Sequence, residues 1–319
     1  MKDIVIGIDV GGTFTKYGIV DREGNCLFEN SISTNSINGA ETFIKEISAT
    51  LKNDLAKFPD VKLCGIGIGA PNGNYYNGTI EFAPNLKWYG IIPVVQLFKK
   101  YFEIPVVLTN DANAAAIGEM IFGGAKGMKD FIVITLGTGL GSGIVSNGEL
   151  VYGHDGFAGE IGHTIVKQNG RQCGCGRRGC LETYASATGI KRTVYKLLAD
   201  SISESKLRAV SFNDLSAEMI TTAAKEGDKI AIEAFEYTAV FLGQRLADSV
   251  AYTSPEAIFF FGGLAKAGEL ILGPTRKHLE EDLLNIYKGK VKILPSGLAE
   301  LNAAVMGTAA LAWKEIGRE

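Results

Sequence analysis

Short apolar runs that end in glycine turns set the hydrophobic pattern of this chain. The run at Ile4–Ile8 leads through Asp9-Val10-Gly11-Gly12-Thr13 into a second apolar run that ends at Val20. The segment Phe131–Val145 repeats this order around Gly137-Thr138-Gly139. β-branched runs of this length predict strands, and glycines at their ends predict tight turns. The pattern therefore predicts one strand–turn–strand unit that is used twice.

Apolar residues at helical spacing follow each of these units and alternate with further strands. The predicted helices are Thr42–Leu55, Val94–Tyr101, Ala112–Phe122, Ala185–Leu198, Leu215–Lys225, Ile230–Ala251, Glu269–Ile286 and Asn302–Ile316. The other predicted strands are Leu63–Ile68, the run that starts at Val106, Ala257–Phe261 and Val291–Leu294. This alternation predicts an α/β fold built in layers.

Composition and charge narrow the class of protein. The 319 residues are 46% hydrophobic and 21% charged, which is ordinary for a globular chain of about two domains. A net charge of −3 provides no basic face for a phosphate backbone, so we do not expect nucleic acid as a partner. No stretch approaches the roughly 20 apolar residues of a membrane span, and the first apolar run is too short for a signal peptide. We therefore expect a cytoplasmic protein without a membrane partner.

The first glycine turn has the residues of a phosphate-binding hairpin. Gly11 and Gly12 leave backbone N–H groups able to face a phosphate, and the Thr13 hydroxyl adds a donor. Asp9 can hold water around Mg²⁺. By itself, the segment is equally consistent with a plain tight turn that an aspartate caps.

The second turn favours the phosphate interpretation, because two phosphate hairpins, one per lobe, bind the nucleotide in the actin-like ATPase fold. Gly262-Gly263, after an apolar strand, suits a place where an adenosine lies against backbone. The chain has no P-loop sequence, which excludes that class of nucleotide-binding protein. The predicted ATP-binding residues are Asp9, Gly11, Gly12, Thr13, Thr15, Lys16, Thr135, Gly137, Thr138, Gly139, Gly262 and Gly263.

Four residues with metal-ligating side chains are close in the sequence: His163, Cys173, Cys175 and Cys180. Three thiolates and one imidazole fill the tetrahedral shell of a structural zinc, and the glycines between them provide sharp turns. A filled shell leaves no position for an activated water, so we expect a structural metal. The alternative is a group of reactive or unligated thiols.

Two carboxylates flank this cluster. Glu160 precedes His163 by three residues, and Glu182 follows Cys180 by two. Carboxylates that accept hydrogen bonds from neighbouring hydroxyls, together with the imidazole nitrogen that is free of the metal, can fix the orientation of a hexose. Lone glutamates are usually solvated, but their position beside metal ligands favours a functional role.

A candidate catalytic base lies in Asn110-Asp111-Ala112-Asn113-Ala114, where a predicted strand ends and a helix begins. Phosphoryl transfer to an alcohol requires a carboxylate that accepts the hydroxyl proton. Considered alone, Asp111 is better explained as a helix N-cap. Together with the other motifs, we favour the base.

Together these motifs resemble the ROK family of bacterial sugar kinases and repressors, most closely its glucokinase-like members, over essentially the whole chain. The resemblance implies an α/β, two-lobed, actin-like ATPase (ribonuclease H-like) fold, with a nucleotide and sugar cleft between the lobes. Residues 1–110 and 302–319 would form the N-terminal lobe. Residues 111–301 would form the C-terminal lobe, with a zinc loop at 163–180.

The resemblance also implies an activity: transfer of the γ-phosphate of ATP, with Mg²⁺ bridging the phosphates, to a hexose, in the first place glucose. It implies Asp111 as the catalytic base. The implied sugar contacts are Asn85, Asn110, Asp111, Glu160, His163 and Glu182, and the implied structural Zn²⁺ ligands are His163, Cys173, Cys175 and Cys180. Family members are commonly homodimers or homotetramers, so we expect the same here.

Other functions stay open. An N-acetylhexosamine kinase, for N-acetylglucosamine or N-acetylmannosamine, would carry the same motifs. A sugar-responsive transcriptional repressor would need an additional N-terminal DNA-binding segment, for which a phosphate hairpin that begins at Asp9 leaves no room. A catalytically silent sugar-binding module would require loss of the base or of the phosphate turns, and all of these are present.

One departure from the family pattern bears on the choice of sugar. Many glucose kinases of the family have Gly-x-Pro-Gly where this chain has Gly69-Ala70-Pro71-Asn72, followed by the polar and aromatic stretch Gly73–Gly78. Because this loop would border the sugar pocket, it leaves open which hexose or N-acetylhexosamine is preferred.

Overall fold

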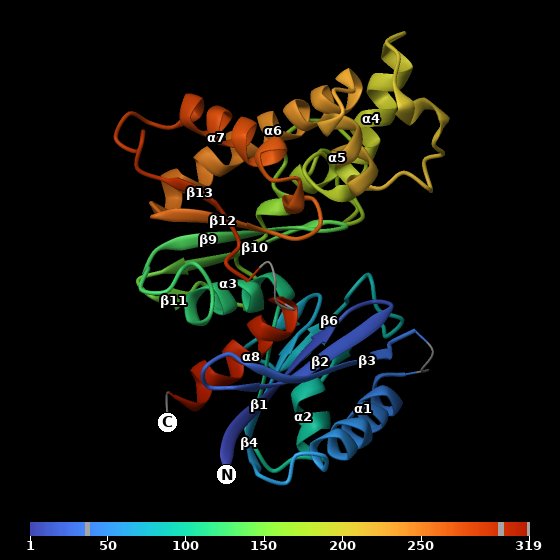
Figure 1. Ribbon diagram of the computed structural model, residues 1–319. Helices are drawn as coiled ribbons and strands as arrows, with labels where there is room; N and C mark the ends of the chain where they lie inside the picture. The colour runs from blue at the N-terminus through green and yellow to red at the C-terminus, as the bar shows by residue number, and fades with distance from the viewer. Residues whose placement is uncertain (36–38, 299–302, 318–319) are drawn as a thin grey trace. The chain divides into compact units, whose positions relative to one another are not determined.

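The computed structural model describes residues 1–35, 39–298 and 303–317. By packing, the chain divides into two compact units (Figure 1). The first unit consists of Met1–Gly127, Leu150–Ala158 and Gly297–Glu319. The second consists of Met128–Glu149 and Gly159–Ser296. Each unit contains a five-stranded sheet and its own helices.

The sheet of the first unit has the strand order β3-β2-β1-β4-β8. Its strands are β1 (Lys2–Val10), β2 (Phe14–Asp21), β3 (Cys26–Ser33), β4 (Val61–Gly69) and β8 (Val106–Thr109). The helices are α1 (Ala40–Leu55), α2 (Val94–Lys99), α3 (Asp111–Ile121) and α8 (Ala303–Ile316), and a small sheet holds β5 (Gly73–Asn74), β6 (Thr79–Glu81) and β7 (Ile91–Ile92). Strands β1, β4 and β8 are parallel, whereas β1, β2 and β3 form antiparallel pairs.

Strand β1 is buried on both faces, which explains its nearly continuous apolar sequence. Alternate residues such as Ile6 pack with the apolar face of α1, and the residues between them, such as Val5, pack with α8. A Cβ added at Gly7 would overlap the backbone of α8 at Val305. The final helix therefore packs directly against the strands of the first unit.

The sheet of the second unit has the order β11-β10-β9-β12-β13. Its strands are β9 (Phe131–Leu136), β10 (Leu140–Ser146), β11 (Glu149–Leu150), β12 (Ala257–Phe261) and β13 (Lys292–Pro295). The helices are α4 (Ala187–Asp200), α5 (Ala217–Lys225), α6 (Lys229–Thr253) and α7 (Glu269–Asp282). Short helical turns lie at Ile161–His163, Leu181–Thr183, Lys206–Ala209 and Ala265–Ala267. The repeated unit is confirmed, because β1–β2 and β9–β10 are both antiparallel hairpins.

Each predicted helix has a counterpart among the described residues, and the differences lie at the ends. The helix predicted to reach Ile286 ends at Asp282, because Leu283 is buried in an extended conformation with ψ of 140°. Asn302, predicted as the first residue of the last helix, lies outside the described residues. Within the ranges that the structure describes, no helix has the length and apolar content needed to cross a membrane.

Candidate active site

The carboxyl ends of the parallel strands in the first unit bring two carboxylates to one edge of the sheet. Asp9 of β1 is in register with Gly69 of β4, which is in register with the last residue of β8, two residues before Asp111. Burial raises the pKa of Asp9 to about 6, and the negative charge of Asp111 adds to the increase. Lys16, which pairs with Asp9 across the hairpin, acts in the opposite direction.

Asn110 and Asp111 begin helix α3. Asn110 is the N-cap, and its side chain accepts a hydrogen bond of 2.7 Å from the N–H of Ala112. Asp111 is the first helical residue, and its Oδ1 accepts from the same N–H at 2.8 Å. The surrounding protein excludes much of the water near the Asp111 carboxyl, and this desolvation raises its pKa although the side chain still reaches solvent. The hydrogen bond from the N–H of Ala112 lowers the pKa to a smaller extent. A carboxyl with a raised pKa is suited to accept a proton.

The first glycine turn is packed against the loop that contains Asn85. A Cβ added at Gly12 would overlap the carbonyl oxygen of Asn85, so glycine is required here for close approach of two backbones. The N–H of Gly11 donates to the carbonyl of Phe14 at 3.2 Å and closes the turn. Asn85 and Thr13 both have exposed side chains. The turn and Asn85 are therefore neighbours in the first unit.

Two predicted ATP-binding residues of this hairpin differ in their surroundings. Lys16 is exposed. Thr15 is fully buried, and its hydroxyl forms a 2.8 Å hydrogen bond with the hydroxyl of Thr34. The hydroxyl of Thr15 therefore contributes to the interior of the unit rather than to the surface of the turn.

In the second unit, two glycine turns lie at one edge of the sheet, because the parallel strands β9 and β12 end side by side. Gly262 has a φ of 103°, and a Cβ added there would lie 2.6 Å from the carbonyl oxygen of Leu136 in β9. Among the described residues, no atom beyond the adjacent residues of the chain lies within 4 Å of a Cβ added at Gly137 or Gly263. Bare backbone on two adjacent turns provides a place where a phosphate or a nucleoside can lie.

The threonines of this hairpin are placed differently. Thr138 is exposed at the turn. Thr135 is half-buried, and its hydroxyl oxygen accepts a 3.1 Å hydrogen bond from the N–H of Gly141. Thr138 is therefore the freer donor for a bound anion.

The segment Gly159–His163 is anchored on strand β10. The Ser142 hydroxyl donates to the carbonyl of Gly159 and accepts from the N–H of Ile161 at 3.2 Å. A Cβ added at Gly162 would overlap the carbonyl oxygen of Leu140. Sequence reasoning missed Ser142, although a buried serine in an apolar strand is a signal for an internal hydrogen bond.

Glu182 lies between the metal-ligating residues and the second glycine turn. Its Oε2 accepts from the N–H of Leu140 at 3.3 Å, and its Oε1 lies 3.1 Å from Cys173 Sγ and 3.8 Å from His163 Nδ1. On the other side of the ring, Glu160 Oε2 lies 4.0 Å from His163 Nε2. The two carboxylates therefore face the two nitrogens of one imidazole.

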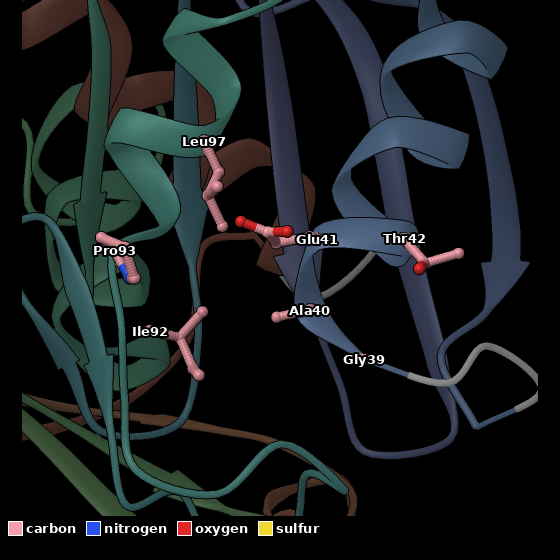
Figure 2. Close-up of a pocket in the computed structure, with 7 residues that line it drawn as sticks. All are labelled: Gly39, Ala40, Glu41, Thr42, Ile92, Pro93 and Leu97. Atoms are coloured by element: carbon pink, nitrogen blue, oxygen red, sulfur yellow. The ribbon is translucent and has the colours of Figure 1, made fainter.

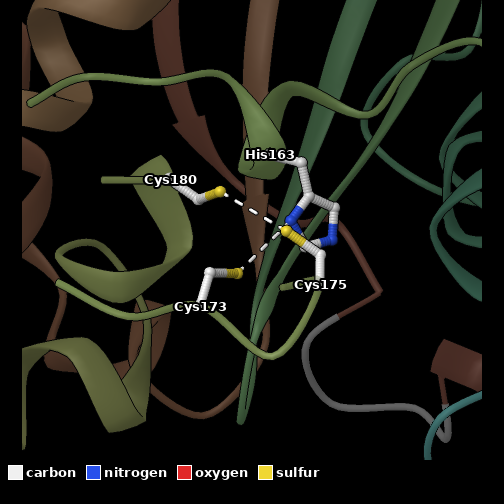
Figure 3. A group of neighbouring side chains, drawn as sticks. All are labelled: His163, Cys173, Cys175 and Cys180. Atoms are coloured by element: carbon white, nitrogen blue, oxygen red, sulfur yellow. Dashed lines mark hydrogen bonds between the residues drawn. The ribbon is translucent and has the colours of Figure 1, made fainter. Parts of the chain in front are cut away.

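The predicted metal ligands come together as one cluster (Figure 3). The ligand atoms of His163, Cys173, Cys175 and Cys180 all lie within 4.8 Å of one another. Cys175 Sγ is 3.6 Å from Cys180 Sγ, and Cys173 Sγ is 3.7 Å from His163 Nδ1. Ligands held about 2.3 Å from a tetrahedral zinc are about 3.8 Å apart, so the donor set and its spacing fit this ion.

The three thiols of this loop differ in their electrostatics, because burial raises the pKa of Cys173 and Cys180. Burial acts to raise the pKa of Cys175, but the backbone N–H and guanidinium of Arg177 and the neighbouring thiols lower it to about 6. A thiolate is the form that binds a metal.

Arg171, a second residue that sequence reasoning missed, donates to the carbonyls of Thr183 (2.8 Å) and Gly189 (3.0 Å). Its guanidinium thereby joins the start of the cysteine loop to the segment after it.

Each unit also has a hollow apart from these residues. In the first unit, a hollow of about 390 Å³ is lined by Gly39, Ala40, Glu41, Thr42, Ile92, Pro93 and Leu97 (Figure 2). In the second, one of about 320 Å³ is lined by Lys206, Leu207, Val210, Glu218, Met219, Thr222, Ala223 and Glu226. Neither hollow is lined by a predicted site residue. The candidate site is therefore identified from the side chains of its residues and not from a cavity.

Comparison with known proteins identifies a family and several relatives of this chain. The ROK family profile matches residues 5–315. A glucokinase of Thermotoga maritima is 34% identical over 98% of this chain and 98% of its own length. The crystal structure of a ROK family glucokinase from Streptomyces griseus, in complex with glucose and AMPPNP, matches with a TM-score of 0.82 and 34% identity over 98% of this chain and 99% of that one.

Repressors match at lower identity. A xylose repressor of Caldicellulosiruptor bescii is 30% identical over 97% of this chain and 78% of its own length. The structural matches to sugar kinases confirm the predicted actin-like ATPase fold.

Proposed function

This chain belongs to the ROK family, and we propose that it is an ATP-dependent hexokinase that phosphorylates glucose to glucose 6-phosphate. The observation that carries the proposal is the pair of strand-end carboxylates, Asp9 and Asp111, in a chain whose second sheet edge presents bare glycine turns. The similarity to glucokinases, one of which binds glucose and AMPPNP, supports the choice of substrates.

In this proposal Asp111 is the general base. Its carboxylate accepts the proton of the reacting sugar hydroxyl as the new P–O bond forms and the bond to ADP breaks. The raised pKa of Asp111 favours this proton transfer. Because Asp111 is the first residue of α3, the helix fixes the position from which its carboxylate meets the sugar hydroxyl. Asn110 orients the segment as the N-cap and offers its amide to the sugar.

The remaining contacts divide between sugar and nucleotide. Glu160, Glu182 and the Nε2 of His163 accept or donate hydrogen bonds to sugar hydroxyls, and Asn85 adds a further contact. The turns at Gly11–Thr13 and Gly137–Gly139 bind phosphates through backbone N–H groups, and Gly262-Gly263 lies against the adenosine. Asp9, a hard oxygen donor beside a second carboxylate, fits Mg²⁺, which supplies charge neutralisation of the phosphates when bound.

We also propose that the cluster of three cysteines and His163 holds a structural zinc. The four side chains would fill its shell, so the metal would take no part in proton transfer. Its role would be to hold the His163 ring, with Nδ1 toward the cluster and Nε2 toward Glu160. Glu182, in contact with Cys173, would be fixed by the same loop.

One observation favours glucose over an N-acetylhexosamine. The loop after Pro71 is packed against residues 152–155: Asn74 is buried and donates to the carbonyl of Asp155 at 2.9 Å. The rings of Tyr75 and Tyr152 stack with centroids 4.1 Å apart. A loop packed in this way offers little freedom to admit an acetamide group.

A coupled assay of ADP release tests the proposal, with glucose, mannose, fructose, N-acetylglucosamine and N-acetylmannosamine as acceptors. We expect the highest kcat/KM with glucose. A tenfold or greater preference for either N-acetylhexosamine, about 1.4 kcal/mol in the transition state, would establish the alternative kinase instead. Absence of turnover with every hexose would reject the kinase.

A further inference from the structure

The backbone of the loop after β4 is unusual at Asn72. Asn72 has a φ of 51°, in the left-handed region that favours glycine and that asparagine tolerates better than most residues. A glycine at this position would adopt the same conformation without strain. The asparagine therefore keeps the turn and adds a side chain.

That side chain bonds to another segment of the first unit. Asn72 Nδ2 donates to the carbonyl oxygens of Glu81 at 2.9 Å and Phe82 at 3.3 Å. The carbonyl of Asn72 accepts from the N–H of Glu81 at 3.1 Å. Three hydrogen bonds thus join the loop after Pro71 to the end of β6.

The backbone is strained at Phe82, whose carbonyl oxygen accepts one of the hydrogen bonds from Asn72. Phe82 has a φ of 49°, a conformation that aromatic residues rarely adopt. Its side chain is 53% exposed, so burial of the ring does not enforce the conformation. The N–H of Phe82 donates to the carbonyl of Gly90 at 2.9 Å. Strain persists only where the surroundings determine it, so the hydrogen bonds of Phe82 with Asn72 and Gly90 hold this turn together with the contact of its ring with Tyr89.

The strained turn leads directly to a predicted sugar contact. Asn85 follows Phe82 by three residues, and its backbone carbonyl lies against Gly12. At its other end, the loop with Asn72 begins beside the strand that precedes Asp111, where the N–H of Ala70 donates to the carbonyl of Thr109 at 3.0 Å. Asn72 thus connects the backbone near the proposed base to the backbone that carries Asn85.

We propose that Asn72 is a positioning residue for the sugar: its amide fixes the turn at Phe82 and thereby places Asn85. The inference rests on the proposed function, in which Asn85 contacts the hexose. Asn72 acts through the backbone of the turn and takes no part in proton transfer. It sets the KM for the sugar and leaves ATP binding unchanged.

Asn72→Gly is the sharpest test, because glycine keeps the left-handed backbone and removes only the amide. Asn147→Gly is the matched control: Asn147 has a φ of 53° and is exposed in the turn before β11. We expect Asn72→Gly to raise the KM for glucose about fivefold to tenfold, with kcat and the KM for ATP within about twofold. Asn72→Asp should act in the same direction, because its carboxylate would face two carbonyl oxygens.

Amide hydrogen exchange of residues 80–90, without ligand, tests the turn independently of activity. We expect faster exchange at Phe82 and Leu86 in Asn72→Gly, and wild-type rates in Asn147→Gly. Unchanged exchange would overturn the inference whatever the substrate is. Faster exchange with an unchanged KM for glucose would overturn the link to sugar binding. If the wild-type protein phosphorylates no hexose, the proposed function and the sugar part of the inference both fail, and exchange alone decides whether Asn72 holds the turn.

Discussion

The carboxyl ends of the two sheets carry different chemistry on the same hairpin topology. In the first hairpin, the next-to-last residue of the leading strand is Asp9, paired with Lys16. In the second hairpin the corresponding residue is Thr135, paired with Gly141. Burial raises the pKa of Asp9, and a second carboxylate at this edge, Asp111, adds to the increase.

This difference shows what a repeated topology determines and what it leaves to individual residues. The hairpin places a strand end and a glycine turn at the same edge of the sheet each time. The side chains then decide the chemistry: carboxylates suit protons and cations, and hydroxyls with bare glycines suit anions. Substitutions at the carboxyl end of one sheet should therefore change other kinetic constants than substitutions at the carboxyl end of the other sheet.

Asp111→Asn should have the largest effect, because it removes the proposed proton acceptor and keeps the shape of the side chain. We expect kcat to fall on the order of 10³-fold, with the KM for glucose changed only slightly. Steady-state kinetics with Asp60→Asn as the control, an exposed aspartate before β4, checks this. Near-normal turnover would leave Asp111 with a purely structural role at the start of α3.

Asp9→Asn comes second and tests the cation role of the first edge. We expect kcat/KM to fall tenfold to a hundredfold at pH 7.5, as is usual when an outer ligand of a metal is lost, with a higher Mg²⁺ requirement. Because the pKa of Asp9 is about 6, its ionisation should contribute to a rise in wild-type activity between pH 5 and 7, and only the contribution of Asp111 should remain in the variant. Asp3→Asn, at the other end of β1, is the control. An unchanged pH profile would contradict the assignment.

The same variant has an effect on stability whose sign follows from the pKa. The pKa of Asp9 is raised from 3.8 to about 6 by folding, so ionisation opposes the folded state. The stability that the protonated form provides is complete below pH 4 and is lost as the pH rises through 6. In buffer without nucleotide or Mg²⁺, Asp9→Asn should match the wild-type Tm at pH 4 and exceed it at pH 7.

The sequence predicted strands, hairpins and the metal cluster because each depends on residues close together in the chain. The ligand atoms of Cys173, Cys175 and Cys180 meet within one loop, so their spacing was sufficient. The contacts of Ser142 and Arg171 join segments 12 to 19 residues apart, and nothing local in the chain specifies such partners.

The position of Thr15 follows from the alternation of exposed and buried residues in β2. Phe14 and Lys16 are exposed, and Thr15 and Tyr17 are buried, which is the alternation of a strand. The apolar residues of β2 on the buried face already indicated that Thr15 points inward. Thr13 lies in the turn before β2 begins and is exposed, so it is the candidate for phosphate contact, whereas Thr15 belongs to the buried face of the strand.

Cys175→Ser should have a moderate effect that is confined to the second unit. We expect about one zinc per chain in the purified wild-type protein, and loss of zinc with a lower Tm in the variant. The KM for glucose should rise about tenfold, because His163 and Glu182 are held by the cluster. Cys64→Ser, outside the cluster, should change neither quantity. A protein that contains no zinc and is fully active would reject the metal site.

The smallest effect, and the closest comparison of the two hairpins, concerns their exposed hydroxyls. Thr13 and Thr138 each follow a turn glycine and are both exposed, so each can donate to a phosphate oxygen. Thr138→Val should raise the KM for ATP about fivefold to tenfold, which corresponds to about 1 to 1.4 kcal/mol and is typical of one exposed hydrogen bond, and leave the KM for glucose unchanged. Thr13→Val should act in the same direction, and Thr42→Val, exposed in the first turn of α1, is the control. A selective rise in the KM for glucose from Thr138→Val would mean that the second hairpin binds sugar rather than phosphate.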